Sequence, residues 1–147
     1  MNPINDQLRS LRLGHAINAL EQQQEQLSTY AELGFEERLS LLLESEILGR
    51  NHAKIQRLKR QAKLRIEGQP NQLTYKEGRG LKRTQMSELL TGGYLHKKQN
   101  VLITGPTGAG KTYVACALAT QACEQLHSVR YHRLSRLLDD LSSGRLD

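Results

Sequence analysis

The sequence is poor in several residue types that commonly build or crosslink a fold. It contains no tryptophan, one phenylalanine and two cysteines among 147 residues. With so few aromatic side chains, a core must rest on leucine, isoleucine, valine and alanine, and the length allows one ordinary domain or two small pieces. No apolar run approaches the length of a membrane span, and the N-terminus lacks the apolar stretch of a secretory signal. We therefore expect a cytoplasmic protein without a membrane partner.

The two cysteines do not predict a disulfide. Cys116 and Cys123 are seven residues apart in a stretch with helical spacing, and two helical turns separate their Cα atoms by roughly 10 Å, too far for a disulfide. Neither has a histidine or a second cysteine at zinc-ligand spacing. We expect two small buried thiols in a reducing compartment.

A glycine-rich stretch follows three apolar residues, Val101 to Ile103. It consists of Gly105, Pro106, Thr107, Gly108, Ala109, Gly110, Lys111 and Thr112. The spacing is that of the phosphate-binding loop, in which backbone N–H groups wrap a triphosphate and glycine allows close approach. We expect Lys111 to contact the β- and γ-phosphates of ATP, and the Thr112 hydroxyl to be a ligand of Mg²⁺. The apolar stretch before the loop and the helical spacing after it are the context that this motif requires.

Acidic residues are scarce in the middle third of the chain. Residues 1–49 carry 3 basic and 8 acidic side chains, residues 50–98 carry 13 and 3, and residues 99–147 carry 5 and 4. Seven basic residues occur without an acid between them: Arg50, Lys54, Arg57, Lys59, Arg60, Lys63 and Arg65. Such a surface attracts DNA through its backbone phosphates, with an affinity that falls as salt rises. A solvated helix face with no ligand explains the same pattern and stays open.

Apolar spacing divides the chain into three parts. Residues 1–66 predict a helical N-terminal domain, with one helix over 5–27 and a longer one that runs from Phe35 through Ala62, either continuous or broken near Gly49. Residues 67–84 have the glycine and proline content of a linker. Residues 85–147 predict a short helix and then strand, helix, strand and helix, with the strands at 101–104 and 128–132. The expected fold class is α/β, a helical domain followed by the first two βα units of a truncated parallel sheet.

Hydrolysis of a nucleotide would also need a second acid, usually at the end of an apolar strand. Asp139 and Asp140 follow two leucines. We predict that both lie on the polar face of a helix, because the leucines around them repeat at helical spacing. The sequence therefore does not predict whether this chain hydrolyses ATP.

The order of these segments resembles a known family. A helical segment ends in Arg57-Leu-Lys-Arg-Gln-Ala-Lys-Leu-Arg, the loop lies in Gln99-Asn-Val-Leu-Ile-Thr-Gly-Pro-Thr-Gly-Ala-Gly-Lys-Thr, and Val129-Arg-Tyr-His-Arg-Leu-Ser-Arg-Leu-Leu-Asp-Asp-Leu follows. In this order the chain resembles the IstB-like ATPases, which are transposition helper proteins of bacterial insertion sequences and AAA+ relatives of DnaC-type helicase loaders. The resemblance covers nearly the whole chain but only the first part of such a protein.

The resemblance implies ATP-dependent assembly on DNA, with homo-oligomers that cooperate with a transposase. Residues 105–112 match the family's nucleotide loop, and residues 50–65 match its basic N-terminal region. The family's second acid, sensor residues and arginine finger match nothing here, so the chain is expected to be an N-terminal portion. Two alternatives remain: a DnaC-type helicase loader, and a non-catalytic fragment that binds DNA or a partner through its helices.

Overall fold

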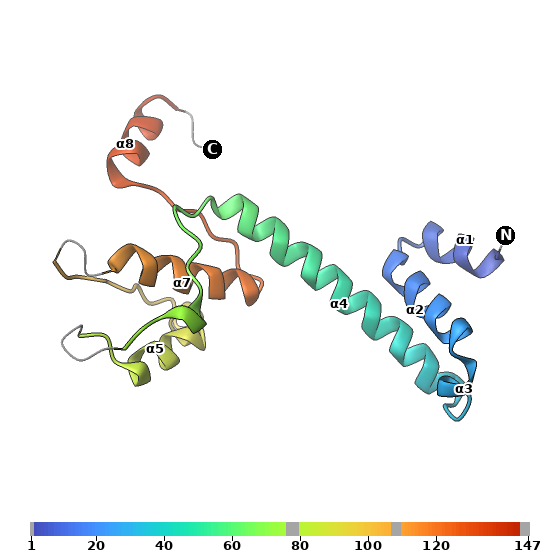
Figure 1. The fold of residues 1–147 in the computed structure, drawn as a ribbon. Helices are drawn as coiled ribbons and strands as arrows, with labels where there is room; N and C mark the ends of the chain where they lie inside the picture. The colour runs from blue at the N-terminus through green and yellow to red at the C-terminus, as the bar shows by residue number, and fades with distance from the viewer. Residues whose placement is uncertain (1, 76–79, 107–109, 145–147) are drawn as a thin grey trace. The chain divides into compact units, whose positions relative to one another are not determined.

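The computed structural model describes residues 2–75, 80–106 and 110–144, which form a series of helices (Figure 1). In chain order they are α1 (Pro3–Ser10), α2 (Gly14–Glu25), α3 (Leu27–Tyr30), α4 (Phe35–Ala62), the 3-10 helix η1 (Pro70–Gln72), α5 (Arg83–Leu90), α6 (Gly93–His96), α7 (Lys111–Glu124) and α8 (Leu134–Ser142). The chain divides into two compact units, residues 1–54 and 55–147, so the division falls inside α4. The expected division at residues 66 and 84 stays a prediction. No helix in the described ranges is both long and apolar enough to cross a membrane.

The predicted parallel sheet is wrong. Across the described ranges the chain contains no β-strand, and both segments expected to form strands, 101–104 and 128–132, are irregular. The backbone N–H of Tyr131 donates to the carbonyl of Ala62 at the end of α4, rather than to a neighbouring strand. Leu102 is 88% exposed. An apolar run supplies strand propensity but not the paired neighbour that a sheet needs, and among the described residues no strand lies beside it.

The first unit contains α1, α2, α3 and the first part of α4. Residues 5–27, expected to form one helix, are divided near Arg12, whose backbone is left-handed with φ 61°. Ala16 and Ile17 of α2 are buried. Glu46 of α4 is also buried, at 4% exposure, and its carboxylate accepts a hydrogen bond from the backbone N–H of His15 at 3.2 Å. A carboxylate without a partner would be costly to bury, so this bond helps to fix α2 against α4.

Helix α4 is continuous through Gly49, which decides between the two alternatives left by the sequence. Its apolar side is not uniformly covered: Phe35 is 70% exposed and Ile47 59%, whereas Leu58 and Ala62 are buried. The predicted helix face is therefore present, but among the residues that can be described only its C-terminal end belongs to a core.

The second unit is built around α7. Met86 of α5 is fully buried against Val114, Ala117 and Leu118 of α7, and Leu73 completes this cluster. A second cluster joins Leu58 and Ala62 of α4 to Cys123 of α7. Both cysteines are free and buried, as predicted. The helix predicted before Gly92 is confirmed as α5.

The segment before α5 is held against α7 by Tyr113. The backbone N–H of Gln69 donates to the Tyr113 hydroxyl at 3.2 Å, and this hydroxyl lies 3.1 Å from the side-chain oxygen of Gln72. Gly68 is buried and lies close to α7: an added Cβ would be 2.8 Å from the carbonyl carbon of Cys116. Tyr113 directly follows the glycine-rich loop, so these contacts fix the helix that carries the loop.

Candidate nucleotide site and basic surface

The glycine-rich loop leads directly into α7. Gly110 is the residue before the helix and has a left-handed backbone with φ 86°, a conformation that glycine adopts without steric cost. Gly105 and Pro106 are exposed, whereas Lys111 and Thr112 are half-buried in the first turn. Thr107, Gly108 and Ala109 lie outside the described residues. The described ends of the loop thus have the helix start that the motif requires.

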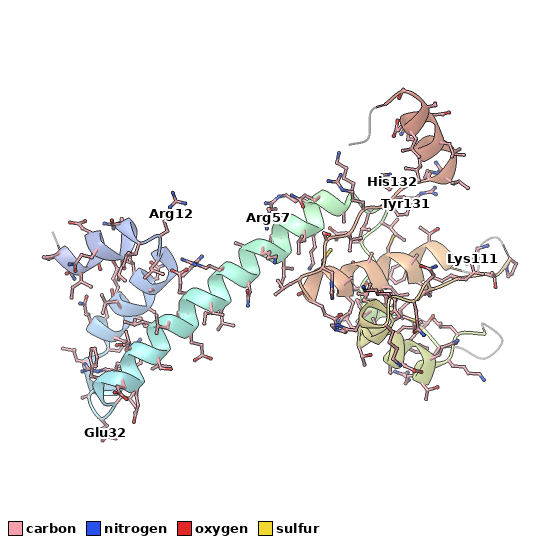
Figure 2. The ribbon with its side chains drawn as sticks, turned by 180° about the vertical axis from the view of Figure 1, so that it is seen from behind. Arg12, Glu32, Arg57, Lys111, Tyr131 and His132 are labelled. Atoms are coloured by element: carbon pink, nitrogen blue, oxygen red, sulfur yellow. The ribbon has the colours of Figure 1, made fainter. Side chains whose placement is uncertain are left out.

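Lys111 joins the two described ends of the loop. Its Nζ donates a hydrogen bond to the carbonyl oxygen of Gly105, six residues earlier. Figure 2 labels Lys111 at the N-terminal end of α7, where this bond brings its positive charge to the beginning of the loop. A cation at this position can interact with the terminal phosphates of a bound nucleotide.

The start of α7 also offers backbone donors. The first backbone bond described at this end runs from the N–H of Val114 to the carbonyl of Gly110, at 3.1 Å. The N–H groups of Lys111 and Thr112 come before it, and the first N–H groups of a helix have no partner four residues earlier within the helix. Together with the helix dipole they favour an anion. A triphosphate therefore fits the residues that the structure describes here.

The side chains suited to Mg²⁺ are fewer. Thr112 supplies a hydroxyl at the second position of α7, as the motif requires. Throughout the described ranges, no group of three or more histidine, cysteine or acidic side chains is arranged to hold a metal ion. Asp139 and Asp140 lie on α8, which confirms that they belong to a helix and not to the end of a strand. The fit to Mg²⁺ therefore depends on Thr112 and on the phosphates of the nucleotide.

A cavity of about 620 Å³ lies beside the loop. Thr104, Gly105, Pro106 and Lys111 line it together with apolar residues of α5 and α7. Among the described residues of this lining, Glu88 of α5 is the one acidic side chain. No sequence motif points to Glu88, because it lies 23 positions before Lys111 and reaches the cavity through the packing of α5 on α7.

The predicted basic residues fall into two groups. Arg50 and Lys59 are engaged: Arg50 Nη2 donates to the carbonyl of Arg12 at 2.8 Å and its Nε to Glu46 at 3.3 Å, and Lys59 pairs with Glu124. The other five are exposed and form no ion pair with any described residue. They are Lys54, Arg57, Arg60, Lys63 and Arg65. The five exposed residues are the ones available to a polyanion, and DNA contact stays a prediction.

The sequence missed a second group of basic residues. A cavity of about 510 Å³ brings Arg130, Arg133 and Arg136 together with Lys63 and Arg65. Residues 128–132, which include Arg130, were expected to form a short strand, and Arg133 and Arg136 follow it, so these arginines were not counted with the basic helix. The available signal was the spacing of three arginines within seven residues.

A glycine-rich loop that ends at a helix start, with its lysine turned back to the first glycine, is typical of the P-loop nucleotide-binding class. The chain belongs to a family described as IstB-like ATP binding protein, whose family model matches residues 6–147. This finding confirms the family resemblance. Family membership does not change the conclusion that the predicted parallel sheet is wrong, because the described residues contain no strand.

The similar proteins carry names of the same kind. A protein named for ATP binding in insertion sequence IS1162 of Pseudomonas fluorescens is 42% identical over 136 residues, which cover 92% of this chain and 58% of that protein. An insertion sequence ATP-binding protein of Sinorhizobium fredii is 39% identical over 116 residues, covering 79% and 47%. An insertion sequence ATP-binding protein of Mycobacterium tuberculosis is 30% identical over 144 residues, covering 98% and 57%. The chain spans about half the length of the curated relatives it matches.

Proposed function

We propose that this chain binds ATP together with Mg²⁺ as part of a helper protein of DNA transposition. The contact of Lys111 with Gly105 is the observation that carries the proposal, because it places the lysine of the motif at the beginning of the loop. The left-handed Gly110 and the donors at the start of α7 support the same role. The matched family and the names of the relatives, which refer to insertion sequences, favour transposition over helicase loading.

In this proposal each described residue of the loop has a separate task. The Lys111 ammonium holds the β- and γ-phosphates, and the N–H groups of Lys111 and Thr112 donate to phosphate oxygens. The Thr112 hydroxyl is a ligand of Mg²⁺, which when bound offsets the charge of these phosphates. The proposal concerns binding, and these residues do not by themselves provide a base for hydrolysis.

The DNA part of the proposal rests on the exposed basic residues. Arg57 and Arg60 of α4 have no ion-pair partner among the described residues. Side chains of this kind contact phosphates without selecting a base sequence. We propose that the helper binds the DNA backbone through them, forms homo-oligomers and acts with a transposase.

Nucleotide binding can be tested with a fluorescent ATP analogue in the presence of Mg²⁺. Lys111→Ala removes the charge at the beginning of the loop and should abolish binding, whereas Lys97→Ala, an exposed lysine outside the loop, should not. Thr112→Val should retain binding without Mg²⁺ but lose the gain that Mg²⁺ provides. Circular dichroism would verify that each variant is folded. Equal affinity of Lys111→Ala and the parent would refute the proposed nucleotide site.

DNA binding requires its own test. Neutralising Arg57 and Arg60 together should weaken binding to every duplex sequence and flatten its dependence on salt. If this variant binds DNA as tightly as the parent, these side chains are only a solvated surface.

A further inference from the structure

The cavity at the end of α4 gathers positive charge from three segments of the second unit. Its volume is about 510 Å³. Lys63 and Arg65 follow α4, Arg130 and Arg133 lie between α7 and α8, and Arg136 lies in the first turn of α8. Among the described residues that line it, Asp140 is the one acidic side chain. The described lining therefore combines five formal positive charges with a single negative charge.

Among the described residues, no carboxylate forms an ion pair with these cations. In contrast, Lys59 pairs with Glu124. Arg130, Arg133 and Arg136 are also exposed. Like charges held close together repel, and an anion bound among them would remove this repulsion.

The fold holds the three segments together through the backbone. The N–H of Tyr131 donates to the carbonyl of Ala62 at 2.9 Å, which fixes the segment carrying Arg130 and Arg133 at the end of α4. Helix α8 then begins at Leu134, directly after Arg133, and its first turn contains no acidic residue. The positive end of the helix dipole therefore adds to the charge of the arginines. In Figure 2 the labelled Tyr131 and His132 lie in this segment, beside the start of α8.

We propose that this cavity binds phosphates of a nucleic-acid backbone, with Arg130, Arg133 and Arg136 as contacts in addition to the basic residues of α4. The inference rests on the proposed DNA contact and extends it to the segment between α7 and α8. Arginine suits this task because its planar fork can donate two hydrogen bonds to one phosphate.

A nucleic acid fits the surface better than a single free phosphate because the positive charge does not end at the cavity. Arg57 and Arg60 lie on α4 shortly before Lys63, and both are exposed. The six residues from Arg57 to Ala62, at the end of α4, span roughly 7.5 Å along the helix axis. Successive phosphates of one DNA strand rise by about 3.4 Å along the duplex axis. A bound strand can therefore present one phosphate to the cavity and others to the helix.

The test compares two variants with the same change in net charge. In the cavity variant Arg130, Arg133 and Arg136 are changed to glutamine, and in the control variant Lys82, Lys97 and Lys98, exposed lysines of the same unit, are changed to glutamine. Binding to a fluorescein-labelled 20-base-pair duplex is followed by anisotropy over a series of salt concentrations. The cavity variant should lose about tenfold or more in affinity, and the slope of log affinity against log salt should decrease in magnitude by up to about 2.7, or 0.9 for each lost phosphate contact. The control variant should change less in both quantities.

Three results would overturn the inference. One is an equal loss of DNA affinity in the cavity and control variants, which would mean that only the net charge of the protein affects binding. Another is a cavity variant that binds DNA as tightly as the parent while neutralising Arg57 and Arg60 weakens binding; in that case the DNA contact of α4 is retained and only the cavity contact is rejected. The third is calorimetric binding of inorganic pyrophosphate that is lost in the cavity variant without any effect on DNA binding, which would assign the cavity to a free anion.

A parent protein that does not bind DNA at all would instead reject the DNA contact in the proposed function. The single variant Arg133→Gln, with a smaller loss in the same direction, checks the result if the triple variant does not fold.

Discussion

The backbone N–H of Tyr131 donates a 2.9 Å hydrogen bond to the carbonyl oxygen of Ala62. Ala62 is the last residue of α4, where carbonyl groups have no partner within the helix, so Tyr131 satisfies a group that would otherwise need water. In the last turns of α4, Leu58 and Ala62 also pack on Cys123. The C-terminal end of α4 therefore shares a core with α7, the helix that carries the candidate nucleotide loop.

This shared core predicts a large effect for Leu58→Ala. Leu58 is 5% exposed, and its truncation should lower the free energy of unfolding by about 2–4 kcal/mol through lost burial and a residual cavity. Leu48→Ala on the same helix is a matched control, because Leu48 is 62% exposed and should change stability by no more than about 0.5 kcal/mol. Urea denaturation followed by circular dichroism measures both. Similar losses in the two variants would show that Leu58 is not in a core.

A side chain added at Gly68 should clash with the backbone of α7. A Cβ at this position would overlap the backbone nitrogen of Ala117 and would lie 2.9 Å from the carbonyl oxygen of Tyr113. Since backbone atoms cannot move as a flexible side chain can, Gly68→Ala should push the chain away from α7 and cost about 1–3 kcal/mol. Gly34→Ala is the control, because an added Cβ there meets nothing within 4 Å. A melting temperature that is lowered only in Gly68→Ala would support the close contact of Gly68 with α7, and equal melting temperatures in the two variants would contradict it.

Arg50 and Arg57 should respond differently to the same substitution. Arg50 Nε lies 3.3 Å from the buried carboxylate of Glu46, and Nη2 lies 2.8 Å from the carbonyl of Arg12. Because the arginine itself is largely exposed, Arg50→Gln should cost only about 1 kcal/mol of stability. Arg57→Gln, which removes an exposed side chain, should leave stability within about 0.5 kcal/mol.

The two variants should have the opposite order in DNA binding. Arg57→Gln should weaken binding and Arg50→Gln should not, because the Arg50 guanidinium is already engaged within the protein. Thermal unfolding and duplex anisotropy on both proteins make the comparison. If Arg50→Gln weakens DNA binding while leaving stability unchanged, its guanidinium is free for phosphates and the contacts with Glu46 and Arg12 are not important.

Features set by neighbouring residues were predictable from the sequence. The phosphate-loop motif predicted the helix start at Lys111, and leucine spacing placed Asp139 and Asp140 on a helix. Long α4 followed from its apolar spacing, because periodicity is a property of a single segment. The family resemblance depended on the same local residues and was confirmed.

Features set by distant residues were not predictable. The apolar run at 101–104 could not show whether a second strand would lie beside it, and in the described chain none does. The arginines at 130, 133 and 136 lie far from Lys63 and Arg65 in the sequence, and the hydrogen bond from Tyr131 to Ala62 helps to bring the two segments together. Glu88 reaches the loop cavity for a similar reason, through packing of Met86 on α7.

Because Cys123 is buried, we expect its thiol to react slowly and the stability of the protein to depend on pH. Its side chain is fully buried, and this burial raises the pKa of the Cys123 thiol, with Lys59 lowering it and Glu124 raising it. The unfolded chain therefore loses the thiol proton at a lower pH than the folded chain. As pH rises from about 8 to 9.5, the folded state binds more protons than the unfolded state, so stability should fall in this window.

A Cys116→Ala background isolates this thiol. Alkylation of Cys123 by iodoacetamide should be at least about tenfold slower in the native protein than in urea, since reaction requires an exposed thiolate. The fall in the free energy of unfolding as pH rises from about 8 to 9.5 should be smaller when Cys123 is also changed to alanine, because the thiol responsible is then absent. Native alkylation as fast as in urea would place the Cys123 thiol at the surface, and the packing of Cys123 against Leu58 and Ala62 would have to be rejected with it.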